Sequence, residues 1–179
     1  MVNVHQHVDS SDEAFQPRLN VLLTRDRSCS GEHWTEQLPR LLEPQGVWSR
    51  IVSTGQEAIE AAEQVDFHAA VIDMATPVTS SGAPGRAALD TSGGIWILEL
   101  FRRMPNAPAA VVVQNRTHSQ RQLAQILHTT LRLGAFSVVN KPVTIEQLLD
   151  VFRRVLERHY QGVWPAPGRG RGREPGDRS

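Results

Sequence analysis

The strongest constraint on the fold is a short apolar run followed by a segment of helical periodicity, a unit that occurs five times along the chain. Short apolar runs between turn-forming residues predict buried strands, whereas apolar residues at helical spacing predict helices with one buried side. The predicted strands are 19–24, 47–53, 67–74, 105–115 and 135–140, and the predicted helices are 31–46, 54–65, 94–104, 118–134 and 144–160.

These apolar runs lack the alternation of polar and apolar residues that marks a half-exposed strand, as the run ending at Asp73 shows best. Strands of this kind are buried on both faces, as in parallel sheets. Five of them joined by helices predict an α/β protein with a doubly wound, five-stranded parallel sheet covered on both faces. Such sheets place their ligands beyond the carboxyl ends of the strands.

Two helices carry specific expectations. Pro39 should kink or shorten the first helix, because a proline inside a helix removes a hydrogen bond. Spacing predicts that the inward-facing residues of the first and third helices are Trp34, Leu38, Leu41, Leu42, Ile95, Leu98 and Phe101.

The chain divides by composition into a domain and flanking segments. Residues 1–17 are polar and are interpreted as a flexible arm, and residues 18–160 form the predicted domain. A long loop at 75–93 is rich in Ser, Gly, Pro and Ala. Residues 161–179 are an Arg, Gly and Pro-rich tail that cannot build a core and is predicted to be disordered.

Bulk properties exclude several classes of protein. Formal net charge is +0, so no global field attracts nucleic acid or an anionic membrane. The sequence has a single cysteine, Cys29, which predicts a cytoplasmic setting without internal disulfides. No signal peptide is recognisable at the start, and no apolar run is long enough to span a membrane.

Charged and polar residues follow four of the predicted strands. Asp26 lies just past the first strand, Asp73 ends the third, Gln114 and Asn115 end the fourth, and Lys141 follows the fifth. The carboxyl ends of parallel strands meet at one edge, so Lys141 is expected to reach Asp73, with Asp26 on the same rim. A lysine in that place needs a partner, because burying an unpaired ammonium is costly.

The sequence here resembles the receiver domains of two-component response regulators. The resemblance covers about residues 19–158 and is carried by "AAVIDMATP", "GAFSVVNKP" and "STGQEAIEAA" in their order along the chain. It implies the flavodoxin-like receiver fold with strand order 2-1-3-4-5. It also implies that Asp73 stands where the family has its phosphoacceptor, and that Lys141 pairs with the phosphoryl oxygens.

The resemblance further implies a Mg²⁺ ion held by Asp26, Asp73 and the backbone carbonyl of Ala75. A metal and a fixed cation neutralise charge during phosphoryl transfer, while the protein mainly positions the groups. Asn115, or alternatively Gln114, would contact the phosphoryl group where the family has a threonine or serine.

Four features depart from the family pattern. Arg25 replaces one acidic residue after the first strand, so a site with Asp26, Asp73, Lys141 and an inward Arg25 sums to zero charge and attracts Mg²⁺ weakly. Arg25 either pairs with Asp73 or points to solvent; both readings stay open. Val138 stands at the family's aromatic switch position, the family's hydroxyl after the fourth strand is missing, and the loop at 75–93 is unusually long.

These observations favour a stand-alone atypical receiver in two-component or phosphorelay signalling. It would act through protein contacts, with phosphorylation of Asp73 weak or absent. The alternative is a working phosphoacceptor that uses Asp73, Mg²⁺ and Lys141. Expected partners are a histidine kinase, a phosphotransfer protein or another regulatory protein, often met in the family on the fourth helix, fifth strand and fifth helix, with a homodimer as a further option.

A third class, an enzyme or nucleotide-binding protein on the same sheet, is disfavoured. The segment "TRDRSCSG" after the first strand matches no glycine-rich phosphate loop. No spacing indicates a nucleophile with its base, so no enzymatic activity is expected. RNA contact through the Arg-Gly tail is a remaining minor alternative, although no nucleic-acid partner is expected.

Overall fold

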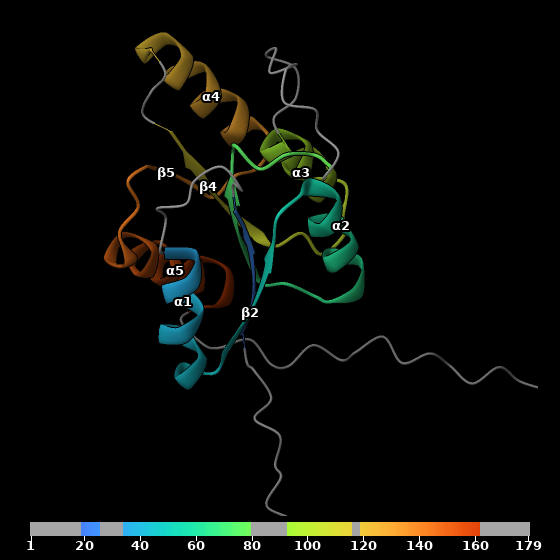
Figure 1. Ribbon diagram of the computed structural model, residues 1–179, viewed down its shortest axis with the longest axis vertical. Coiled ribbons are helices and arrows are strands. Elements are labelled where there is room, and N and C mark those ends of the chain that lie inside the picture. Colours follow the sequence, from blue (N-terminus) through green and yellow to red (C-terminus); the bar gives the residue numbers. More distant parts are fainter. Residues whose placement is uncertain (1–18, 26–33, 80–92, 116–118, 162–179) are drawn as a thin grey trace, which may run out of the picture.

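The computed structural model describes residues 19–25, 34–79, 93–115 and 119–161. Its five strands form one parallel sheet in the order β2-β1-β3-β4-β5, which confirms the predicted fold class (Figure 1). The strands are β1 (Leu19–Thr24), β2 (Val47–Val52), β3 (Ala69–Asp73), β4 (Ala109–Gln114) and β5 (Ser137–Asn140). The predicted arm, most of the long loop and nearly all of the predicted tail lie outside the described residues.

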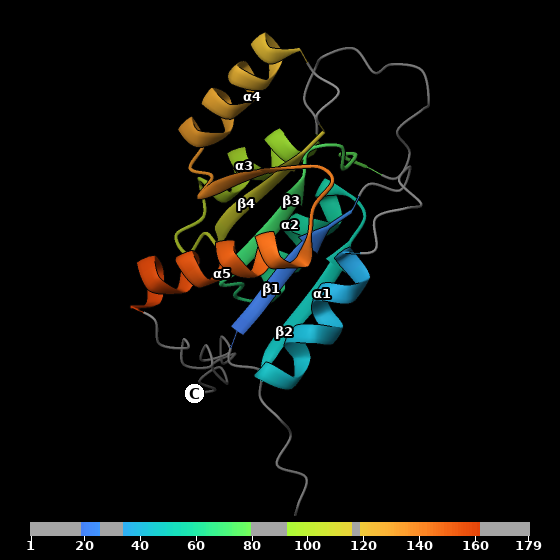
Figure 2. The same ribbon diagram turned by 90° about the vertical axis from the view of Figure 1, so that its left-hand side faces the viewer.

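The helices cover both faces of the sheet. They are α1 (Trp34–Leu42), α2 (Gly55–Gln64), α3 (Gly93–Phe101), α4 (Gln120–Arg132) and α5 (Ile145–Tyr160), and a short 3-10 turn, η1 (Glu43–Gln45), follows α1. Figure 2 shows α1 and α5 in front of the sheet and α2 and α3 behind it. Alternate strand residues therefore point into two separate cores.

The core beneath α1 and α5 contains Val21, Leu23, Val71, Val111 and Val113, all almost fully buried. The opposite core lies beneath α2 and α3 and contains Leu22, Ala70, Ile72 and Val112. Every second residue of each central strand thus belongs to the same core. Burial on both faces explains why the sequence of these strands shows no alternation of polar and apolar residues.

Two expectations about inward-facing residues are wrong. Leu41 is 53% exposed, whereas Trp34 and Leu38 of the same helix are buried. In α3, Ile97 is fully buried together with Leu98 and Phe101, whereas Ile95 is only partly buried. Pro39 lies inside α1, a helix of nine residues, and the short element agrees with the expected effect of proline.

Side-chain caps fix where three helices begin. The hydroxyl of Thr54 accepts a hydrogen bond from the backbone N–H of Glu57 at the start of α2. Ser119 with Gln122 and Thr144 with Gln147 form reciprocal capping boxes at the starts of α4 and α5. Such caps satisfy backbone donors that have no partner inside the helix.

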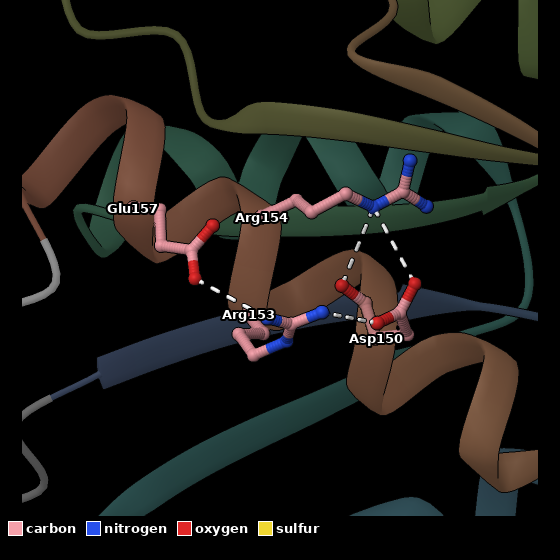
Figure 3. Close-up of polar contacts among 4 residues, drawn as sticks. All are labelled: Asp150, Arg153, Arg154 and Glu157. Atoms are coloured by element: carbon pink, nitrogen blue, oxygen red, sulfur yellow. Dashed lines mark hydrogen bonds and ion pairs between the residues drawn. The ribbon is translucent and has the colours of Figure 1, made fainter.

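The solvent-facing side of α5 carries a chain of ion pairs (Figure 3). Arg153 contacts Asp150 at 2.8 Å and Glu157 at 3.5 Å, and Arg154 lies 3.6 Å from Asp150. The hydrogen bond from Arg153 lowers the pKa of Asp150, with the nearby positive charges adding to the effect. All four side chains are exposed, so these pairs support the helix without fixing the fold.

His68 connects several elements at the amino-terminal edge of the sheet. Its Nδ1 accepts a hydrogen bond of 2.9 Å from the backbone N–H of Asn20, and its carbonyl accepts one from the hydroxyl of Tyr160. Burial lowers the pKa of His68, while the negative charge of Asp66 acts in the opposite direction. Through its ring and its carbonyl, His68 thus links β1, the start of β3 and the end of α5.

Candidate functional site

The candidate site lies at the carboxyl edge of the sheet, where Asp73 ends β3 and Lys141 follows β5. The two strands are not neighbours, because β4 runs between them. In the register of the sheet, Asp73 lies opposite Val113 of β4, and Val113 lies opposite Val139 of β5. This parallel alignment brings residues about 70 positions apart to one place on the rim.

Asp73 and Lys141 form a buried ion pair, with 2.7 Å between the Lys141 Nζ and the Asp73 Oδ2. The side chains are 1% and 6% exposed, respectively. The expectation that these two residues meet is therefore confirmed. The peptide bond between Lys141 and Pro142 is cis.

Lys141 is also the single lysine of the sequence, in which all other basic side chains except histidine are arginine. A lysine ammonium is a compact point charge, whereas a guanidinium is a broad planar fork. The Lys141 side chain is 6% exposed and its Nζ lies 2.7 Å from the Asp73 Oδ2, so a compact cation suits this buried position.

Two threonines that the sequence analysis does not single out, Thr24 and Thr76, form hydrogen bonds next to Asp73. The backbone N–H of Asp73 donates to the hydroxyl of Thr24 at 2.8 Å, and the hydroxyls of Thr24 and Thr76 bond to each other at 2.8 Å. The other carboxylate oxygen, Oδ1, accepts a hydrogen bond from the backbone N–H of Ala75 at 2.9 Å. Both oxygens of Asp73 are thus engaged within the protein.

The position of Thr24 is a signal that was available in the sequence. Thr24 ends the first apolar run, at the same edge as Asp73, and it is fully buried. A buried hydroxyl at a strand end needs a hydrogen-bond partner, and the backbone N–H of Asp73 supplies one. Its bond to Thr76 depends on the path of the loop after β3, which the sequence pattern does not specify.

Arg25 does not pair with Asp73 in this structure. Its side chain is exposed, and its Nε donates to the hydroxyl of Ser53 at 3.4 Å, near the start of α2. The backbone N–H of Arg25 continues the ladder to Val52 of β2. Of the two readings left open for this residue, the outward one describes the structure. Asp26 lies outside the described residues, so its predicted place on the rim stays a prediction.

The end of β4 contributes an apolar side chain on the face that carries Asp73. Val113 is fully buried in the core beneath α1 and α5 and lies directly opposite Asp73. Gln114, one residue on, donates from its Nε2 to the Oδ1 of Asn140 at 2.9 Å. Asn115 follows the strand with an exposed side chain, and its predicted contact with a phosphoryl group stays a prediction.

The loop after Asp73 is fastened at both described ends. The carbonyls of Pro77 and Val78 accept hydrogen bonds from Gly55 and Gln56, the first N–H groups of α2. At the other end, a Cβ added to Gly93 would clash with the backbone of Thr76 and Pro77. The long loop therefore leaves and re-enters the domain at neighbouring points.

The described residues alone supply a poor magnesium site. They contain no group of three His, Cys, Asp or Glu side chains that could hold a metal ion. Asp73 brings one carboxylate, which is already engaged by Lys141 and Ala75. Magnesium prefers several oxygen ligands, so a site here depends on Asp26 and on the carbonyl of Ala75.

Helix α4 is loosely packed for an element beside the sheet. Within this helix, whose residues are all described, Thr130 alone is buried. Leu127 and Leu131 are 41% and 48% exposed, and Leu149 of α5 is 39% exposed. Val138 of β5 is partly buried.

No helix among the described residues has the length and hydropathy needed to cross a membrane.

Comparison with known proteins identifies the fold by structure and not by sequence. No protein-family model matches the sequence, and no curated relative matches it either. A CheY-like response regulator receiver domain from Methanospirillum hungatei is similar in structure, with a TM-score of 0.60 and 19% identity over 81% of this chain and 98% of that chain.

Two further structures are similar. The receiver domain of a sensor histidine kinase from Pseudomonas aeruginosa, with a magnesium ion in its active site cleft, gives a TM-score of 0.53 at 17% identity, covering 77% of this chain and 97% of that one. A two-component response regulator from Clostridium difficile has a TM-score of 0.55 and 16% sequence identity, and the match covers 79% of this chain and 98% of that chain. The residues that the structure describes therefore have the fold of response regulator receiver domains.

Proposed function

We propose that the chain is a stand-alone atypical receiver of two-component or phosphorelay signalling. It acts through protein contacts in the cytoplasm, has no enzymatic activity, and is phosphorylated at Asp73 weakly or not at all. The receiver fold and the meeting of Asp73 with Lys141 support the assignment to this type of signalling. The departures at the rim support the atypical form.

The observation that carries the proposal is that the Asp73 carboxylate is buried and both of its oxygens are already in contact with other groups of the protein. A phosphoacceptor attacks its donor through a carboxylate oxygen, which must be reachable and free to form the new bond. Asp73 is 1% exposed, its Oδ2 is bound to Lys141, and its Oδ1 is bound to the N–H of Ala75. In addition, Val113 lies beside Asp73 and offers no hydrogen bond to a phosphoryl oxygen.

Mg²⁺ binding is proposed to be weak. The groups that would hold the ion are Asp73, Asp26 and the carbonyl of Ala75, and a bound ion would neutralise charge on a phosphoryl group. Lys141 already neutralises Asp73 at 2.7 Å, which reduces the attraction for a second cation. The magnesium held by the receiver domain from Pseudomonas aeruginosa shows that the fold accommodates the ion in that protein.

Partner contact is proposed on the surface formed by α4, β5 and α5. Leu127 and Leu131 of α4 and Leu149 of α5 are large apolar side chains that are 39% to 48% exposed. Exposed apolar side chains of this kind gain free energy when a partner covers them. A histidine kinase, a phosphotransfer protein, another regulatory protein or a second copy of the chain is the expected partner.

The test is phosphorylation by a small donor. The purified chain is incubated with acetyl phosphate and Mg²⁺ and its intact mass is measured, with Asp73→Asn as the control. We expect a small labelled fraction at most. Labelling of most molecules that disappears in Asp73→Asn would overturn the proposal and favour the second candidate.

That second candidate is a working phosphoacceptor. The observation in its favour is the position of Lys141, whose ammonium lies where it would also reach the oxygens of a phosphoryl group on Asp73. In this candidate Lys141 moves from the carboxylate to the phosphoryl group, and Mg²⁺ is held as described above. The same labelling experiment decides between the two.

A further inference from the structure

A pair of side-chain amides joins the last residues of β4 and β5. Gln114 and Asn140 lie directly opposite each other in the sheet, and the Nε2 of Gln114 donates to the Oδ1 of Asn140 at 2.9 Å. Gln114 is 5% exposed, whereas Asn140 is exposed. Among the described residues, the Oε1 of Gln114 has no hydrogen-bond partner. The bond to Asn140 is thus what fixes the orientation of this buried amide.

The amide pair and the ion pair lie on opposite faces of the sheet. Val111, Val113 and Val139 belong to the core beneath α1 and α5, and Asp73 and Lys141 continue that alternation. Gln114 and Asn140 follow Val112 and Val138 by two residues and so lie on the opposite face, the one covered by α2 and α3. The amide pair therefore does not touch the ion pair and acts on it only through the backbone.

The backbone connection is short. The N–H of Lys141 donates to the carbonyl of Gln114 at 2.8 Å, and Lys141 directly follows Asn140. Two hydrogen bonds in succession, one between side chains and one between backbones, hold the end of β5 against β4. Lys141 is the first residue beyond them, so its backbone position depends on both.

We propose that Gln114 and Asn140 are positioning residues that keep Lys141 closed on Asp73. This inference rests on the proposed function, because it explains how the atypical receiver holds its pocket shut. An ammonium on a long flexible side chain leaves its partner readily when its backbone moves. β5 is an edge strand, so β4 is its one neighbour in the sheet. The bond between Gln114 and Asn140 therefore restricts movement of the backbone at the end of β5, just before Lys141.

The single lysine makes a direct experiment possible. Lys141 and the chain amino terminus are the primary amines that a small amine-acylating reagent can modify, and peptide mass spectrometry separates them from each other and from products at other side chains. The initial rate of acylation of Lys141 measures how often its ammonium leaves Asp73. Phosphorylation plays no part in this assay, so its outcome is independent of the test of the proposed function.

Three variants are compared with the wild-type chain under native conditions. Asn140→Ala removes the acceptor of the amide bond, and Asn140→Asp retains an acceptor at the same place. Tyr160→Phe removes a hydrogen bond to His68 at the far end of the sheet and serves as a control for general loosening. Amide hydrogen exchange at Lys141 is measured in parallel.

We expect Asn140→Ala to raise the acylation rate of Lys141 about tenfold and to speed exchange of its backbone N–H. Asn140→Asp should stay within about twofold of the wild type, and Tyr160→Phe should leave both rates unchanged. The inference is wrong if Asn140→Ala acylates at the wild-type rate, or if Tyr160→Phe raises the rate as much as Asn140→Ala does.

Discussion

Removing Lys141 is the perturbation that the structure describes most sharply. Its ammonium and the Asp73 carboxylate are 6% and 1% exposed and 2.7 Å apart. At an effective dielectric constant of about 20, their attraction is about 6 kcal/mol, and most of it is offset by the desolvation of both charges. The net value of the pair is therefore small, whereas the cost of breaking it is large.

Lys141→Met leaves a buried carboxylate that still accepts a hydrogen bond from the N–H of Ala75. Breaking a buried pair in this way costs about 3–5 kcal/mol. We expect a value near the lower end, about 3 kcal/mol, because Ala75 still stabilises the charge. Domains of ordinary stability, about 5–15 kcal/mol, remain folded after such a loss and permit its measurement.

The assay is urea unfolding with linear extrapolation to water. The double variant Lys141→Met with Asp73→Asn should recover most of the loss, because no charge then remains buried. Arg153→Met, which removes an exposed ion-pairing residue, is the matched control and should leave the urea midpoint unchanged. The reasoning is refuted if Lys141→Met loses less than about 1 kcal/mol, or if the double variant is no more stable than the single one.

Three further predictions follow from the described contacts. Thr24→Val leaves the buried N–H of Asp73 and the hydroxyl of Thr76 without this partner, so urea unfolding should show a loss of about 1–3 kcal/mol. Burial lowers the pKa of His68 in the folded chain, so the stabilisation that comes from the neutral side chain is present above its ordinary pKa of 6.5 and is lost as the pH falls below that value. His68→Gln should therefore flatten the decline of the urea midpoint between about pH 7 and 5. Gly93→Ala places a methyl group against the backbone of Thr76 and Pro77, so thermal unfolding should show a destabilisation of about 1–3 kcal/mol.

The sheet and its rim were predictable because both follow from local patterns. The order of strands and helices, the meeting of Asp73 with Lys141 and the starts of α2, α4 and α5 all depend on apolar runs and on residues next to them. The parallel arrangement then brings the strand ends together whatever the details of packing. For this reason the buried ion pair could be expected from residues far apart in sequence.

Details that depend on rotation and loop path could not be predicted. Helical spacing alone leaves the rotation of α3 undetermined, and Ile97 is buried where Ile95 was expected. The start of that helix is set by Gly93 and Gly94, which pack against the backbone after Asp73. Such contacts arise from the course of the loop, which carries no periodic pattern.

The strand register adds a neighbour of Asp73 on β4 that the sequence pattern does not indicate, because Val113 lies directly opposite Asp73. The phosphoryl contact predicted at Asn115, or alternatively Gln114, stays a prediction. A shift of one residue in a strand moves a side chain to the other face. Gln114 consequently faces Asn140 and stabilises the end of β5 instead of contacting Asp73.

The most direct test of the central claim is a crystal structure of the full chain grown with Mg²⁺ and beryllofluoride, a mimic of the phosphoryl group. The account predicts an unmodified Asp73 with the Lys141 Nζ still at ion-pair distance from its Oδ2, as in the closed arrangement at 2.7 Å. Beryllofluoride bonded to the Asp73 carboxylate, with Lys141 turned to its fluorine atoms, would contradict the account and establish a working phosphoacceptor.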